Sequence, residues 1–176
     1  RASQEQAGKA EPLLEDDDPL IRAAAVALQM RAPSNDRTQR IVAALDDPVK
    51  SVRITAARKL LGLPIAHLPK KMALSAQRAS GEWQAALGAR ADFPETHMVI
   101  GGSALILRNP RAAMAAFQEV TRMDPQLVEA WGLIVRLHAA NGDWGAARSA
   151  VQRAQTVNPR SEERRVGQEC RSRWWR

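Results

Sequence analysis

The C-terminal half of the chain contains two segments that share one skeleton at a fixed offset. They span residues 94–125 and 128–159. Superposed without a gap, they place Phe117 on Val151 and Pro125 on Pro159. A fixed period of this kind is typical of repeated helical hairpins, which bury their apolar faces only by stacking on one another. The period therefore predicts an all-α repeat architecture.

The repeated skeleton resembles the tetratricopeptide repeat (TPR). It carries a small residue at one position of each second helix, Ala113 and Ala147, and closes each repeat on a proline. His97, Ile100, Gly101 and Ala104 share one face of the expected first helix, and Phe117 and Val120 lie on the matching face of the second. Small residues there allow close helix approach where larger side chains would clash. His97 and His138 fall at positions that the family usually gives to aromatic residues, so we expect them to be packed or hydrogen-bonded.

Turn residues separate the helices within each repeat. Asn109-Pro110 divides the first pair, and Asn141-Gly142-Asp143 divides the second. Gly142 suits a left-handed position after a helix, and Asp143 suits an N-cap. Asn158-Pro159 repeats Asp124-Pro125, which leads into another helix, so we expect the natural chain to continue into a further one.

The N-terminal half contains two Asp-Pro helix starts, Asp18-Pro19 and Asp47-Pro48. An Asp side chain accepts free backbone N–H bonds, and proline fits the first helical position. Helices are predicted over 20–30, 35–45 and 49–62, the last ending at Gly62. A longer helical pattern runs over about 68–91, in which Gly81 weakens the prediction of one unbroken helix.

The two Asp-Pro segments resemble the short form of the HEAT repeat, through Leu-Leu-Asp/Glu-Asp-Asp-Pro followed by an arginine and paired small residues. Arg22 and Arg53 fall on the family's arginine position. The resemblance implies that they brace a neighbouring Asp and the loop between helices, and ligand binding is the alternative. We therefore expect an α-solenoid with a frayed fragment at 1–11, HEAT-like repeats at 12–63, a bridging helix or degenerate TPR at 64–93, TPRs at 94–159 and a non-native tail at 160–176.

Residues 160–176 closely resemble a translated sequencing adapter. They contain six Arg, three Glu and Cys170, the only cysteine. They supply +3 of the formal net charge of +7, and the remaining +4 is ordinary for a soluble domain. No run of 18 apolar residues is present, so no membrane span is expected. The chain begins at Arg1, which we interpret as the start of an internal fragment whose targeting cannot be read.

Residue patterns for catalysis and cofactors are absent from the sequence. There is no Cys-x-x-Cys-His for haem, and His67, His97 and His138 are isolated from other metal ligands. Gly101-Gly102-Ser103 falls inside a helix rather than on the strained turn of a nucleophile, and the acidic run at 15–18 suits helix capping better than a cation. We therefore expect a non-enzyme without cofactor or metal.

The TPR resemblance implies a concave face lined by five positions of each first helix. The groove is largely apolar, with Arg136 as its one basic residue, so it suits an apolar protein or peptide segment, or the missing N-terminal domain of the same protein. The implied partner-binding residues are Glu95, Met98, Gly102, Leu105 and Ile106 in the first repeat, and Glu129, Gly132, Arg136, Ala139 and Ala140 in the second.

The order of HEAT-like repeats, bridge and TPRs resembles the C-terminal region of bacterial periplasmic multihaem cytochrome c proteins. The phrases at 45–64 and 81–102 carry this resemblance. It implies a scaffold module of an exported electron-transfer protein, with haem bound only in a missing upstream region and a periplasmic location by resemblance alone. The alternative is nucleic-acid binding through a basic face, which we disfavour. That face would use Arg22, Arg37, Arg40, Lys50, Arg53, Arg58 and Lys59.

Overall fold

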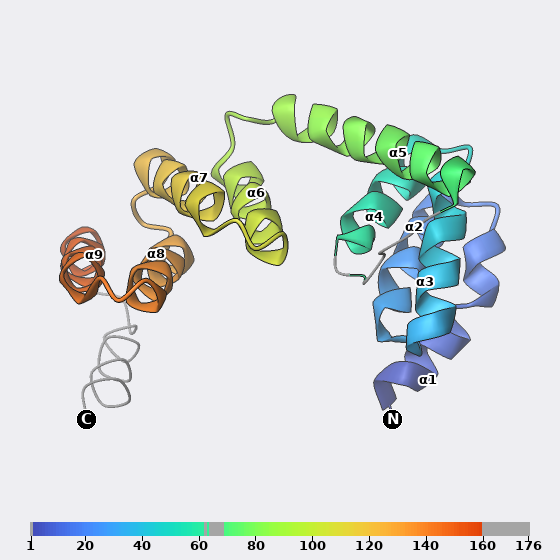
Figure 1. Cartoon of the computed structure of the whole chain (residues 1–176), viewed down its shortest axis with the longest axis horizontal. Helices are drawn as coiled ribbons and strands as arrows, with labels where there is room; N and C mark the ends of the chain where they lie inside the picture. Colours follow the sequence, from blue (N-terminus) through green and yellow to red (C-terminus); the bar gives the residue numbers. More distant parts are fainter. Residues whose placement is uncertain (1, 62, 64–68, 160–176) are drawn as a thin grey trace. The chain divides into compact units, whose positions relative to one another are not determined.

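The computed structural model describes residues 2–61, 63 and 69–159, with side chains from residue 4 onward. Every regular element in these residues is helical, as predicted (Figure 1). The chain divides into two compact units, residues 1–89 and 90–176. The expectations for Gly62, His67 and the tail at 160–176 lie outside the described residues.

The N-terminal unit consists of short helices followed by one long helix. The expected helices at 20–30 and 35–45 are present, and each ends in a 3-10 turn. The elements in order are α1 (Ala2–Lys9), η1 (Pro12–Glu15), α2 (Pro19–Leu28), η2 (Gln29–Arg31), α3 (Ser34–Ala43), η3 (Ala44–Asp46), α4 (Lys50–Leu60) and α5 (Lys70–Gly88).

The two Asp-Pro segments begin their helices differently. Asp18 caps α2, because its carboxylate accepts the Leu20 N–H at 2.7 Å. Helix α4 begins only at Lys50, and the Asp47 carboxylate accepts the Val49 N–H at 2.8 Å just before it. The second helix therefore begins slightly later than the start signal at Asp47 predicts, since this segment carries two extra residues before its arginine.

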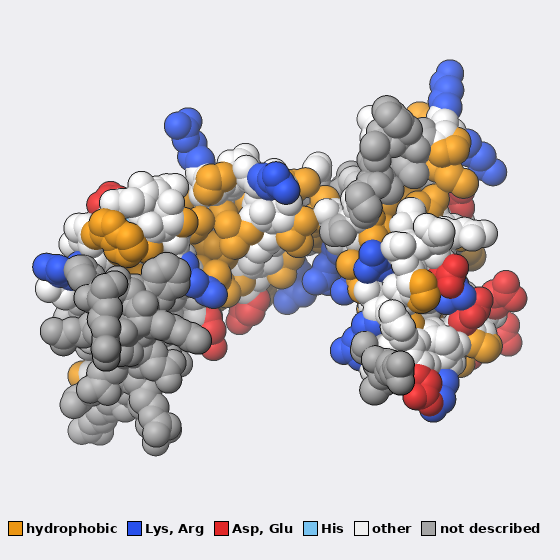
Figure 2. All heavy atoms as spheres, turned by 60° about the horizontal axis from the view of Figure 1, so that its bottom comes forward, with side chains coloured by type: hydrophobic (Ala, Val, Ile, Leu, Met, Phe, Trp, Pro, Cys, Tyr) orange, Lys and Arg blue, Asp and Glu red, His pale blue; other side chains and the backbone are white. Residues whose placement is uncertain are grey.

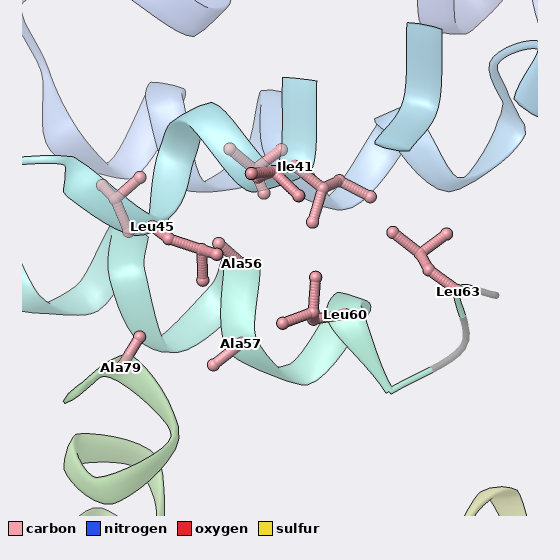
Figure 3. Close-up of a cluster of buried hydrophobic side chains, with 10 residues drawn as sticks. Ile41, Leu45, Ala56, Ala57, Leu60, Leu63 and Ala79 are labelled. Carbon is pink, nitrogen blue, oxygen red and sulfur yellow. The ribbon is translucent and has the colours of Figure 1, made fainter. Parts of the chain in front are cut away.

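Apolar side chains from α2, α3, α4 and α5 form one core in this unit. Figure 3 shows Ile41 and Leu45 facing Ala56 and Leu60 of α4, with Ala79 of α5 nearby. All of these residues are buried. The alanines let α4 and α5 approach closely, because they add little side-chain volume between the helices. Helix α5 therefore packs as the last layer of the N-terminal unit.

Two arginines brace this unit in the same way, one helical layer apart. Arg22 donates from Nη1 to the carbonyls of Asp16 and Asp17, and its Nε and Nη2 bind the Asp47 carboxylate at 2.8 and 3.1 Å. Arg53 donates from Nη1 to the carbonyls that precede α4 and places two bonds on the Glu82 carboxylate of α5 at 2.9 and 2.7 Å. The expected brace to an Asp and the loop is confirmed for Arg22, whereas Arg53 braces its loop but pairs with Glu82 instead of an Asp. Each arginine thus joins its own loop to the next layer.

A buried amide connects α1 to α2 and α3. Gln29 is fully buried, donates to the carbonyls of Ala7 and Ala25 and accepts from Arg40. Arg40 also pairs with Glu11 at 2.7 Å. The polar N-terminal stretch is thus held against the core, because a buried amide must find partners.

The C-terminal unit consists of two helical hairpins. They are α6 (Pro94–Ile106) with α7 (Pro110–Met123), and α8 (Val128–Ala140) with α9 (Trp144–Val157) (Figure 1). Each element of the second hairpin begins and ends at the position equivalent to its counterpart in the first, one repeat period later. One core joins the hairpins, containing Ala104 of α6, Phe117 of α7, Ile134 of α8 and Ala150 of α9.

Candidate functional site

The turns within the two hairpins have the same hydrogen bonds. Asn109 N–H donates to the Ala104 carbonyl at 2.9 Å, and Arg108 N–H to the Leu105 carbonyl at 3.0 Å. The same two bonds recur at the equivalent positions of the second hairpin, where Asp143 and Gly142 are the donors. This pair of bonds defines a Schellman motif, which ends a helix on a residue in the left-handed region. Gly142 has φ 77°, as predicted, and Arg108 has φ 54°.

The residue after each left-handed position begins the second helix. Asn109 accepts the Ala112 N–H at 3.0 Å, and Asp143 accepts the Ala146 N–H at 2.9 Å. Both side chains therefore act as N-caps, which confirms the sequence prediction for Asp143. The turn sequences therefore determine where the first helix of each repeat ends and where the second begins.

At Gly101, α6 packs directly against the Phe117 ring of α7. A Cβ atom at this position would lie 2.7 Å from Cδ1 and Cζ of Phe117, which is closer than side chains pack. Phe117 is fully buried, so its ring has no free space to move into. The expected role of Gly101 in close helix packing is confirmed.

Aromatic rings tie each first helix to the loop that directly precedes it. The Trp131 indole N–H donates to the Pro125 carbonyl at 2.9 Å. His97 is the equivalent of Trp131 in the first repeat, and its Nε2 lies 2.8 Å from the carbonyl of Ala91, the equivalent of Pro125. A carbonyl oxygen only accepts, so Nε2 of His97 carries the proton in this bond. The expectation that His97 is hydrogen-bonded is therefore confirmed.

Residues 104–165 match the tetratricopeptide repeat family. The C-terminal unit, with its two equivalent helical hairpins, is similar to TPR-type helical repeats. No curated protein and no solved structure matches the chain. TPR-type repeats generally mediate protein–protein interaction and are typically non-enzymatic.

The ten residues predicted for the TPR concave face differ in how much surface they offer. Met98 also packs against the core of the unit, so only part of it is available to a partner. Glu95, Leu105, Ile106, Glu129, Arg136 and Ala140 are exposed or half-buried, as are Met98, Gly102, Gly132 and Ala139. These residues remain a prediction for partner binding.

Three consecutive exposed aliphatic residues lie at the C-terminal end of α6. Leu105, Ile106 and Leu107 are 37%, 53% and 61% exposed. Figure 2 shows hydrophobic side chains gathered on the displayed face of this unit. The exposed Arg108 follows directly in the sequence, and the exposed Arg111 lies three residues further on. Sequence reasoning missed Leu107 and both arginines, because it compared the repeats for what they share and did not compare where they differ.

The basic residues considered for nucleic acid are in part already bonded to protein groups. Arg22 pairs with Asp47, Arg53 with Glu82 and Arg40 with Glu11. The hydrogen bond from Arg53 lowers the pKa of Glu82 below its ordinary value. Burial alone would raise the pKa of Asp47, but the bonds from Arg22 and the Val49 N–H outweigh it and lower that pKa. These charges are therefore used to hold helices together.

A cavity of about 500 Å³ lies in the N-terminal unit between η1, α3 and η3. Several of its lining carboxylates are already neutralised: Glu11 pairs with Arg40, Asp46 with Arg78, and Asp47 with Arg22. Part of the negative charge that lines the cavity is therefore neutralised within the unit.

Within the described ranges, no group of three or more His, Cys, Asp or Glu residues has the spacing to hold a metal ion. His138 is half-buried, and its Nδ1 lies 3.9 Å from the Asp143 carboxylate. Among the helices of those same ranges, none is long and apolar enough to cross a membrane.

Proposed function

We propose that the TPR-type unit is a non-catalytic docking module that binds a protein segment through the outward face of α6 and α8. The observation that carries this proposal concerns α6, which is apolar on two faces. Gly101 and Ala104 face the core of the unit, while Leu105 and Ile106 are exposed. A helix that is apolar on more than one side ordinarily has a further partner.

The binding surface combines apolar side chains with acidic ones. Glu95 and Glu129 occupy the first turns of α6 and α8, where a carboxylate interacts favourably with the helix dipole. Leu105 and Ile106 lie at the opposite end of α6. The surface therefore suits a segment that inserts apolar side chains beside Leu105 and Ile106. That segment belongs to another protein or to another domain of the same protein.

We further propose that the N-terminal unit is a HEAT-type scaffold. Two observations support this proposal: Arg22 and Arg53 each bind the loop before their own helix, and each then reaches a carboxylate of the next layer. The composite scaffold would serve an electron-transfer protein similar to multihaem cytochromes c. Haem would then belong to a region outside this chain, because the chain has no Cys-x-x-Cys-His.

Peptide binding to the purified chain tests the docking proposal. Short random peptides displayed on phage would be selected on the immobilised protein, and the selected sequences synthesised. The double variant Leu105→Asp and Ile106→Asp should abolish their binding while circular dichroism stays unchanged. Leu74→Asp is the matched control, since Leu74 is similarly exposed but lies on α5 of the other unit. Unchanged binding by the double variant would refute the proposed surface.

The cofactor proposal has its own test. The purified chain is mixed with haem and followed by absorbance. We expect no stoichiometric complex, and stoichiometric haem uptake would overturn this part of the proposal.

A further inference from the structure

The corner between α6 and α7 carries side chains that the equivalent corner between α8 and α9 lacks. Superposition of the two repeats pairs Leu105, Ile106 and Leu107 with Ala139, Ala140 and Asn141. It pairs Arg108 with Gly142, and Arg111 with Gly145. Both corners have the same backbone hydrogen bonds. The shared turn therefore does not require Leu105, Ile106, Leu107 or the two arginines, since the second corner forms it without them, although it carries its own exposed residue, Trp144, opposite Pro110.

The two arginines stand where the fold disfavours them. Arg108 has φ 54°, a left-handed conformation that costs a residue with a Cβ atom and suits glycine. Arg111 lies in the first turn of α7, where the helix dipole is unfavourable for a cation. A non-glycine residue held in such a conformation is a reason to look for a role beyond the fold. Neither arginine serves the packing of the unit, since both are exposed.

Within the described residues, the positive charges of Arg108 and Arg111 are not matched by neighbouring carboxylates. In the part of the chain that the structure describes, neither Arg108 nor Arg111 forms an ion pair, while Arg122 on the same helix as Arg111 binds Glu119 through two bonds of 2.8 and 2.6 Å. The two arginines follow three aliphatic residues that are all exposed. Guanidinium groups pair with carboxylates in two-bond geometry, so the corner is complementary to acidic residues beside apolar ones.

We propose that the corner formed by Leu105, Ile106, Leu107, Arg108 and Arg111 is the specificity element of the docking surface and recognises an acidic amphipathic segment of a protein partner. The aliphatic side chains receive the apolar residues of that segment, and the two arginines receive its Asp or Glu. This inference rests on the proposed docking function and adds the chemical class of the partner. A protein segment is favoured over an anionic membrane surface, because membrane-binding clusters typically carry about 4–8 basic residues and this corner carries two.

The peptides selected from the random phage library provide the test. We expect them to be rich in Asp and Glu next to Leu, Ile or Phe. The double variant Arg108→Gly and Arg111→Gly, which copies the second corner, should weaken a selected peptide about tenfold at low salt, the size of a charge-assisted interaction. The loss should shrink as salt rises, because ionic contacts at an exposed site are screened. Arg153→Ser is the matched control, since Arg153 is an exposed arginine on α9.

The outcomes separate this inference from the docking proposal. Two outcomes would overturn the inference alone. In the first, the selected peptides lack acidic residues. In the second, the arginine substitutions leave peptide binding unchanged while Leu105→Asp and Ile106→Asp abolish it. If no peptide is selected, or if both double variants bind the peptides unchanged, the docking proposal is overturned as well. Phosphatidylserine–phosphatidylcholine vesicles form the second arm. Vesicle binding that the double arginine variant abolishes would replace the protein partner with a lipid surface.

Discussion

Arg108 and Gly142 hold the same backbone position in two successive turns of the TPR-type unit, and both have positive φ, 54° and 77°. The turns share their hydrogen bonds, so the fold imposes the conformation regardless of the side chain. Glycine adopts it freely, whereas a residue with a Cβ atom is strained there by about 1–2 kcal/mol. The left-handed conformation is therefore unstrained at Gly142 in the second hairpin and strained at Arg108 in the first.

This difference predicts that substitutions at Arg108 and Gly142 change the free energy of unfolding in opposite directions. Arg108→Gly should raise the free energy of unfolding by about 1 kcal/mol, because it removes the left-handed strain. Gly142→Ala should lower it by about the same amount, because it introduces that strain. Urea unfolding followed by circular dichroism measures both changes. Destabilisation by Arg108→Gly would mean that its side chain holds the turn, contrary to its exposure.

Two neighbouring glycines in α6 form a second matched pair. Gly101→Ala should destabilise the unit by about 1–3 kcal/mol, because its Cβ would overlap the buried Phe117 ring. Gly102→Ala has no atom within 4 Å of its new Cβ and should stabilise the helix by roughly 1 kcal/mol. Thermal unfolding of the two variants compares them directly. Equal effects would contradict the close approach of α6 and α7 at Gly101.

The sequence predicted the hairpins of the TPR-type unit well, because period, caps and turn residues all point to the same boundaries. The N-cap of Asp143 and the left-handed Gly142 are local features, and local chemistry decides them. The contact of Arg53 with Glu82 joins residues far apart in the sequence, and no local pattern marks that partner. The concave face stays a prediction, since exposure of Leu105 and Ile106 shows an available surface and not its occupant.

The arginine braces predict how the N-terminal unit responds to acid. Asp47 and Glu82 have folded-state pKa values below their ordinary 3.8 and 4.5. Their contribution to stability is therefore complete above those ordinary values and is lost as pH falls through the lowered ones. Asp47→Asn should lower the melting temperature at neutral pH and flatten its decline in acid. Unfolding scans between neutral and acidic pH measure this, with Asp92→Asn, at an exposed loop residue of the other unit, as control. An unchanged acid profile would mean that the Arg22–Asp47 pair does not stabilise the unit.

The ring–carbonyl bonds to the loops before α6 and α8 predict a loss of stability in both repeats when the ring N–H is removed. Trp131→Phe keeps an aromatic ring but removes the N–H that binds the Pro125 carbonyl, and His97→Phe does the same opposite the Ala91 carbonyl. Each substitution should cost about 0.5–1.5 kcal/mol, the net value of one hydrogen bond. The lower end is expected, because Ala91 and Pro125 are exposed and water can replace the lost donor. Chemical unfolding of both single variants and the double variant measures the losses, which should add, since the two bonds share no partner. A loss for Trp131→Phe with none for His97→Phe would show that the first bond does not contribute to stability.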